Sequence, residues 1–169
     1  MSWERFESVL RRLETSQIAN TAERVGCSLA EIAALEARYG ITLPETYRAY
    51  LRILGHKSGR LFTCDHMAVY YRHVLTRTAS LRADWAEDGG QPEGFPDDAL
   101  VIASRLGEQF EFIRCLNPDD SPVWYFNEWE SKIVESFPSV IDWLECWCGQ
   151  AEQAIASGYF EDFPDGCSP

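Results

Sequence analysis

The segment 27–59 limits the possible folds more than any other part of the chain, because it predicts two short helices joined at a Leu-Pro corner. Ser28 and Glu31 have the S-x-x-E spacing of a capping box, in which side chains satisfy backbone N–H groups at a helix start. Gly40 stands where the first helix needs a left-handed C-terminal residue, which glycine adopts without a Cβ clash. Pro44 suits the first turn of the second helix, where its missing N–H costs nothing.

Both expected helices carry apolar residues at helical spacing, so that each has one face to bury. The stripes consist of Ile32, Leu35 and Tyr39 in the first helix and Tyr47, Tyr50, Leu51 and Leu54 in the second. The segment contains no nucleophile, metal or phosphate signature. It therefore favours a small binding module over an enzyme.

The corner follows the pattern G-[IV]-x-L-P-x-x-[YF]-x-x-[FY]-L, which resembles the start of a SUKH-superfamily domain of the Smi/Knr-like group. The matching residues are Gly40, Ile41, Leu43, Pro44, Tyr47, Tyr50 and Leu51. Looser matches follow in the order of the family at Val101-Ile102-Ala103, Gly107, Val123-Trp124-Tyr125, Ser136-Phe137, Val140 and Leu144. The resemblance covers roughly residues 20–150. The family usually has a run such as N-G-G after the second helix, whereas this chain has GHKSG at 55–59, so the local turn geometry should differ.

The resemblance implies a non-enzymatic binding protein. Bacterial members of the superfamily resemble immunity proteins that neutralise a co-encoded toxin, commonly a nuclease or another enzyme that modifies nucleic acid. The eukaryotic relatives resemble regulatory or scaffold proteins, which gives an alternative function, with the aromatic segment 159–163 as its docking segment. A small hydrolase that uses a cysteine or a carboxylate is a third alternative.

The order of the expected elements predicts one α+β domain over residues 1–169, with 158–169 as a flexible or docked tail. We expect N-terminal helices to cover one face of a mostly antiparallel sheet of about five or six strands, with a closing C-terminal helix. Beside the two helices of 27–59, the periodicity predicts helices at 3–13, 67–85 and 138–156 and strands at 61–63, 99–104, 110–116, 123–126 and 132–135.

The charge is distributed unevenly along the chain. The formal net charge is −12. Residues 1–84 contain 12 Lys+Arg against 9 Asp+Glu, whereas residues 85–169 contain 3 against 18. An acidic second half disfavours nucleic acid and anionic membranes as partners and favours a basic protein, such as a nuclease toxin domain. The alternative interpretation is a solvated acidic surface that serves solubility.

The remaining composition predicts a cytoplasmic protein. No apolar run approaches the roughly 20 residues of a membrane span, and the N-terminus lacks the apolar region of a signal peptide. The six cysteines are scattered, and in a reducing compartment we expect free thiols rather than disulfides.

Known catalytic and metal motifs are missing, so we expect no enzyme activity, no cofactor and no metal. The densest set of metal-ligand residues, Cys64-Asp65-His66 with His73, lacks the spacing of a zinc site. The chain contains no G-x-S-x-G and no P-loop. A spatial Cys–His pair, from Cys27 or Cys64 with His56, His66 or His73, stays open.

The partner-binding residues that we expect are acids in turns and strands of the second half, with one tryptophan as an aromatic anchor. They are Asp97, Asp98, Glu108, Glu111, Asp119, Asp120, Trp124, Glu128, Trp129 and Glu130. One of the two tryptophans should be exposed, and it would be rimmed by glutamates. Trp143 and Trp147 are four residues apart on the last helix, which predicts that both belong to the core.

Overall fold

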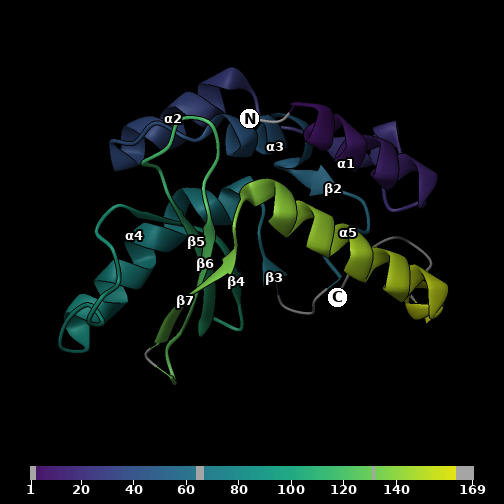
Figure 1. Ribbon diagram of the computed structural model, residues 1–169. Coiled ribbons are helices and arrows are strands. Elements are labelled where there is room, and N and C mark those ends of the chain that lie inside the picture. Colours follow the sequence, from purple (N-terminus) through teal and green to yellow (C-terminus); the bar gives the residue numbers. More distant parts are fainter. Residues whose placement is uncertain (1–2, 64–66, 131, 163–169) are drawn as a thin grey trace.

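A five-stranded antiparallel sheet stands between helices in the computed structural model, which describes residues 3–63, 67–130 and 132–162 (Figure 1). The helices are α1 (Trp3–Thr15), α2 (Leu29–Tyr39), α3 (Glu45–Leu54), α4 (Tyr71–Glu87) and α5 (Val140–Ala156), with short 3-10 turns η1 (Thr21–Glu23) and η2 (Tyr159–Asp162). The sheet order is β3 (Met67–Ala68), β4 (Ala99–Arg105), β5 (Gln109–Arg114), β6 (Val123–Asn127) and β7 (Lys132–Phe137). A separate two-stranded sheet pairs β1 (Arg24–Val25) with β2 (Lys57–Ser58). The α+β fold class and the strand number are confirmed.

The helix ends of the Leu-Pro corner form as the sequence predicts. Ser28 and Glu31 make both hydrogen bonds of the capping box, and Gly40 ends α2 in the left-handed conformation with φ 64°. Pro44 lies one position earlier than expected, because it is the N-cap residue of α3. The first two N–H groups of α3 donate to the carbonyls of Pro118 and Asp119, at 2.8 and 3.1 Å. The β5–β6 turn therefore caps α3 from a distant part of the sequence.

The two faces of the sheet are covered by different helices. Phe110, Phe112 and Phe126 alternate onto one face and pack with Trp85 of α4. The opposite face belongs to the larger cluster that contains Trp143 of α5 and the apolar stripe of α3. The sheet accordingly lies between α4 and α5 in Figure 1. The expectation that the helices cover one face is wrong, because the strand alternation presents apolar side chains on both faces.

One expected strand and one expected helix start also differ from the structure. The segment 61–63 is not a strand, although Leu61 and Phe62 are buried in the core. The helix expected at 67–85 begins only at Tyr71, because Met67 and Ala68 pair with Arg105 and Ser104 as the edge strand β3. Helical spacing of the following apolar residues cannot reveal a two-residue strand whose partner lies more than thirty residues away.

Ion pairs between α1 and α5 neutralise part of the acidic second half. Arg12 holds Glu152 with two parallel hydrogen bonds of 2.7 Å. Arg5 contacts both Asp142 and Glu145 at 2.8 Å. The expected acidic body is thus partly compensated by arginines from the first thirteen residues, and the contact fixes the N-terminal helix on the C-terminal one.

Acid is expected to weaken this contact. Hydrogen bonds from Arg12, and then from Ser16, lower the pKa of Glu152 from 4.5 to about 2. Because the folded pKa lies below the unfolded one, the stabilisation is complete above about pH 4.5 and disappears as the pH falls through 2. Glu152→Gln should lower the free energy of unfolding at pH 7 by about 0.5–1 kcal/mol, since both partners are about one-third exposed.

Urea unfolding at pH 7 and at pH 2 measures this loss. At the lower pH the variant and the parent protein should be nearly equal in stability. The control is Glu7→Gln, because Glu7 lies 3.9 Å from Arg11 on the exposed face of α1 and should contribute almost nothing. An equal loss for Glu152→Gln at both pH values would contradict an ionic origin.

Two core hydroxyls of α3 have no hydrogen-bond partner among the residues that the structure describes. Tyr47 and Tyr50 are 0 % exposed, and neither hydroxyl is paired. An unpaired buried polar group costs about 1–3 kcal/mol, so Tyr50→Phe should leave the free energy of unfolding unchanged or raise it. The control is Tyr39→Phe, because the Tyr39 hydroxyl donates to the Leu75 carbonyl at 3.0 Å. Denaturant unfolding should show a loss of about 1 kcal/mol in the control alone, and equal losses in both variants would refute the prediction.

Candidate partner-binding surface

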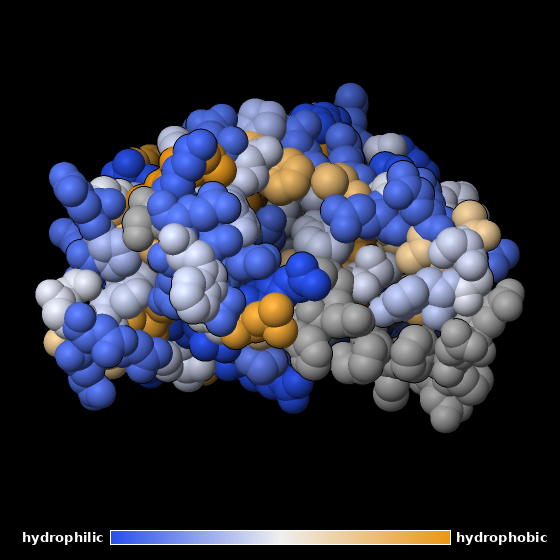
Figure 2. Space-filling model, turned by 90° about the horizontal axis from the view of Figure 1, so that it is seen from below, coloured by the Kyte–Doolittle hydropathy of each residue, from blue (hydrophilic) through white to orange (hydrophobic). Residues whose placement is uncertain are grey.

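The β4–β5 and β6–β7 hairpins turn at the same end of the sheet, the lower end in Figure 1. We call five residues there the hairpin end: Leu106, Glu108, Glu128, Trp129 and Glu130. Figure 2 looks toward this end and shows a largely hydrophilic face on which hydrophobic residues are scattered. Leu106 and Trp129 are the exposed large hydrophobic residues of the hairpin end, and its other three residues are glutamates, so its apolar area is small.

Trp129 is the most exposed large hydrophobic residue of this end, at 78 %. Its indole N–H donates to the Glu108 carboxylate at 2.8 Å. Its backbone N–H donates to the side chain of Asn127 at 2.9 Å, which closes a turn of the kind that asparagine favours. An exposed ring that is held at both its backbone and its polar atom has less side-chain freedom to lose when a partner binds.

The neighbouring glutamates are fixed by the two hairpins together. The backbone N–H of Glu128 donates to the Glu108 carbonyl at 3.1 Å, which ties one turn to the other. The Glu128 carboxylate accepts the indole N–H of Trp85 at 3.0 Å and so connects the hairpin end to α4. Leu106, at φ 55° and 56 % exposed, projects from the other turn. The hairpin end is a built surface rather than two independent loops.

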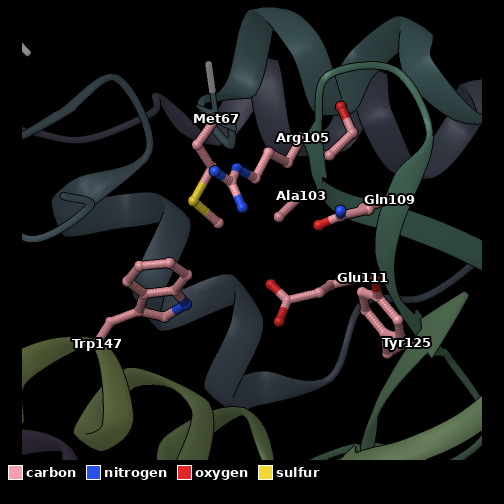
Figure 3. Close-up of a pocket in the computed structure, with 8 residues that line it drawn as sticks. Met67, Ala103, Arg105, Gln109, Glu111, Tyr125 and Trp147 are labelled. Carbon is pink, nitrogen blue, oxygen red and sulfur yellow. The ribbon is translucent and has the colours of Figure 1, made fainter. Parts of the chain in front are cut away.

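A cavity of about 140 Å³ opens on the sheet face beside α5. Its lining residues are Met67, Ala103, Ser104, Arg105, Gln109, Glu111, Tyr125 and Trp147. In Figure 3 the Glu111 carboxylate points into this cavity, with Trp147 and Met67 across from it and Arg105 at its upper side. Two of the lining residues, Arg105 and Gln109, pair with each other on either side of the β4–β5 turn. The cavity therefore lies next to the hairpin end.

Glu111 is a half-buried acid whose carboxylate lies in the cavity and not on the outer surface. Desolvation raises its pKa to about 7, although the indole N–H of Trp143 donates to it at 2.8 Å and works in the opposite direction. At neutral pH this carboxyl therefore exchanges readily between its protonated and ionised forms. Among the described residues that line the cavity, it is the one carboxylic acid, with neither a histidine nor a cysteine beside it. The cavity thus presents one carboxyl group from the part of the chain that the structure describes, whereas the Cys–His pair that the structure does bring together, Cys27 with His56, lies outside this cavity.

The other acids expected at the site lie elsewhere. Asp98 pairs with Arg114 at 2.9 Å, and the Asp97 side chain accepts from Gln91, so both lie near the start of β4. Asp119 and Asp120 belong to the β5–β6 turn, which joins the opposite ends of the strands from the hairpin end.

The Asp120 carboxylate has a structural role in that turn. It accepts the backbone N–H groups of Ser121 and Val140, at 2.8 and 3.1 Å, and so helps to begin α5. Its partial burial raises its pKa, against these hydrogen bonds. Trp124 packs against the α4 cluster. The structure therefore brings together Glu108, Glu128, Trp129 and Glu130, and it separates the other residues that we expected at the site.

The aromatic tail is docked where the structure describes it. Phe160 is 7 % exposed, and the Arg60 guanidinium lies 5.0 Å from its ring centre. Tyr159 packs edge-on against Phe160. Phe163, the other ring of the tail, lies outside the described residues. The ring of Phe160 is thus used within the fold, which leaves less of this segment for docking to a partner.

The structure also places several of the cysteines and histidines that the sequence analysis considered. Cys27, Cys115, Cys146 and Cys148 are free thiols, whereas the set Cys64-Asp65-His66 lies outside the described residues. His73 accepts a hydrogen bond from Arg72.

Within 3–63, 67–130 and 132–162, no helix is both long enough and apolar enough to cross a membrane.

Comparison with protein-family models identifies the family of this chain. The model of the SMI1 / KNR4 family (SUKH-1) matches residues 26–146, which run from the start of the Leu-Pro corner into α5. The match includes the whole hairpin end and all of the cavity lining except Trp147. Comparison with curated proteins gave no match. Because the family model covers more than half of the sequence, this protein belongs to the SMI1/KNR4 family (SUKH-1).

Proposed function

We propose that this protein is a non-enzymatic immunity protein that neutralises a cognate bacterial toxin by binding it through the hairpin end. The SUKH family is an immunity-protein superfamily, which supports the general class. The observation that carries the proposal is Trp129, which is 78 % exposed and yet held by the Glu108 carboxylate. Tryptophan dominates binding hot spots because one ring buries a large area at a small entropic cost.

The charge of the surface favours a basic partner. The Glu108 carboxylate accepts the Trp129 indole N–H, and Glu128 and Glu130 flank Trp129 in the sequence, so that acids lie beside the anchor as a polar rim does in protein interfaces. Carboxylates in this arrangement steer a cationic surface toward the anchor and speed its encounter. A nuclease domain, whose active site must attract phosphates, has such a cationic surface. Binding over that site would occlude it without any chemistry on the part of this protein.

The test is affinity capture from the native host at low salt with three baits. They are the parent protein, Trp129→Ala and Leu116→Ala; Leu116 is 69 % exposed but lies beside the β5–β6 turn, away from the hairpin end. We expect one basic protein that the parent and Leu116→Ala baits retain and that Trp129→Ala loses. That protein should be toxic when expressed alone and harmless when co-expressed with the parent protein.

Two outcomes would count against the proposal. Retention of the same partner by the Trp129→Ala bait would place binding on another surface. Capture of a harmless housekeeping complex would favour the regulatory or scaffold function instead.

A further inference from the structure

Three residues with metal-ligand side chains meet at one place outside the hairpin end and the cavity. The Cys27 sulfur, a Glu31 carboxylate oxygen and a His56 ring nitrogen all lie within 4.8 Å of one another. The three side chains come from the connection after β1, the first turn of α2 and the turn after α3. Nothing in the proposed function uses them.

Backbone hydrogen bonds fix the main chain on both sides of this cluster. The N–H of Cys27 donates to the Leu51 carbonyl at the end of α3, and the N–H of His56 donates to the Val25 carbonyl, both at 2.8 Å. These bonds place Cys27 and His56 on neighbouring segments of chain. The capping box in turn fixes Glu31 one turn into α2. The donors are thus carried by backbone that is already in position, which is what a metal site requires.

Space for the sulfur depends on the glycine before His56. A side chain added at Gly55 would bring its Cβ to 2.4 Å from the Cys27 sulfur and 2.5 Å from the Leu51 carbonyl oxygen. Gly55 has φ −65°, an ordinary helical value, so the backbone conformation does not demand glycine here. The requirement comes from the close approach of the sulfur and the backbone of α3. The thiol is therefore packed in one place, next to the two other donors.

The remaining contacts orient the carboxylate and the imidazole. His56 Nε2 lies 2.9 Å from Glu31 Oε1, while Glu31 Oε2 accepts the Ser28 backbone N–H at 2.8 Å. One carboxylate oxygen thus serves the helix cap and the other faces the histidine. The Tyr71 ring packs edge-on to His56 at 5.5 Å, and its hydroxyl donates to the Glu31 carbonyl at 2.8 Å.

We propose that Cys27, Glu31 and His56 form a binding site for a transition-metal dication of the zinc type. A thiolate, an imidazole and a carboxylate are the three ligand kinds that zinc accepts, at about 2.0–2.3 Å. A tetrahedral ion with these bond lengths holds its donor atoms roughly 3.5 Å apart. Side-chain movements on the order of 1 Å would therefore bring the three donor atoms to bonding distance of one ion. Binding releases the Cys27 proton to solvent and replaces the His56–Glu31 contact by two bonds to the ion. The fourth position stays open for water.

Because Cys27 is buried, its thiol loses its proton at neutral pH only when a cation binds beside it. Desolvation, and then the charge of Glu31, raises the pKa of Cys27 to about 12, so without a cation it is a neutral thiol. A bound dication balances the two negative charges of Cys27 and Glu31. Metal binding should therefore appear as a thiolate bond, which has an optical signature that a surface carboxylate site lacks.

The test is a titration of the purified, reduced protein with Co²⁺ alone, followed by displacement with Zn²⁺. We expect one equivalent of Co²⁺ to produce a thiolate-to-cobalt charge-transfer band and the visible bands of a four-coordinate ion, both removed by Zn²⁺. Cys27→Ser and His56→Gln should abolish the charge-transfer band or weaken binding by more than about 100-fold, which exceeds the usual cost of losing a supporting residue.

Matched controls keep the result specific. Cys146→Ser and His73→Gln remove one residue of each kind away from the cluster, and both should bind Co²⁺ as the parent does. His56 is exposed, so His56→Gln tests the site even if Cys27→Ser destabilises the core. Absence of a one-to-one cobalt complex in the parent would overturn the proposal. The same charge-transfer band in the folded Cys27→Ser variant would overturn it as well, because the thiolate would then come from another cysteine.

Discussion

Glu111→Gln is expected to stabilise the protein at pH 8 and to remove a pH dependence that the parent protein shows between about pH 4.5 and 7. Desolvation raises the pKa of Glu111 from 4.5 to about 7 in the folded state. The folded protein therefore binds this proton more tightly than the unfolded chain does. Its stabilising contribution is complete below about pH 4.5 and is lost as the pH rises through 7.

The size of this effect follows from the shift in pKa. At about 1.4 kcal/mol for each pKa unit, the parent protein loses at most about 3 kcal/mol between the two pH limits. Glutamine is neutral at both limits and retains an oxygen that accepts the indole N–H of Trp143. We therefore expect Glu111→Gln to match the parent near pH 4.5 and to exceed it by about 2–3 kcal/mol at pH 8.

Urea unfolding of both proteins at pH 5 and pH 8 measures the difference. Glu135→Gln is the control, because Glu135 is an exposed acid on β7 of the same sheet and should change stability little at either pH. A parent protein that is equally stable at pH 5 and pH 8, with no gain in Glu111→Gln, would show that this carboxyl is solvated.

The second large effect is expected at the hairpin end. Trp129→Ala should weaken binding of the cognate toxin by about 30- to 1,000-fold, the range for loss of a hot-spot ring of about 2–4 kcal/mol. Most of the loss should appear in the dissociation rate, as for most interface mutations. Thermal stability should hardly change, because the ring is 78 % exposed.

Surface plasmon resonance with the captured partner measures both rates. Leu116→Ala removes a hydrophobic side chain of similar exposure at a distant turn, and it should bind as the parent does. An unaltered dissociation rate in Trp129→Ala would remove the hairpin end from the interface. Equal losses in both variants would indicate that any exposed apolar residue contributes and that the surface is nonspecific.

The local features of the fold could be predicted because they depend on neighbours in sequence. The capping box of Ser28 and the left-handed Gly40 are set by residues within a few positions. The strands of the meander alternate clearly enough to be recognised one at a time. By contrast, β3 is only two residues long, and it is a strand because Met67 pairs with Arg105 of the neighbouring strand β4. Its partner, not its composition, determines its conformation.

The candidate site was only partly predictable for the same reason. The sequence indicates that one tryptophan near the Asn127-Glu128 turn should be exposed among acids, and Trp129 is. Its hydrogen bond to Glu108 spans 21 positions and depends on how two hairpins meet. The inward position of Glu111 could have been suspected from its place among apolar residues of β5, but burial follows from the packing of α5 above it. The α1–α5 ion pairs join residues about 140 positions apart, so the sequence cannot reveal which acids they neutralise.

The most direct test of the account is the activity of the isolated toxin in the presence of this protein. Increasing amounts of the purified parent protein are added to the captured partner at low salt, and the partner's own enzymatic activity is measured. We expect inhibition to be complete at one equivalent, to be retained by Leu116→Ala, and to require a large excess of Trp129→Ala. Full activity of the partner in a saturated complex would contradict neutralisation by occlusion.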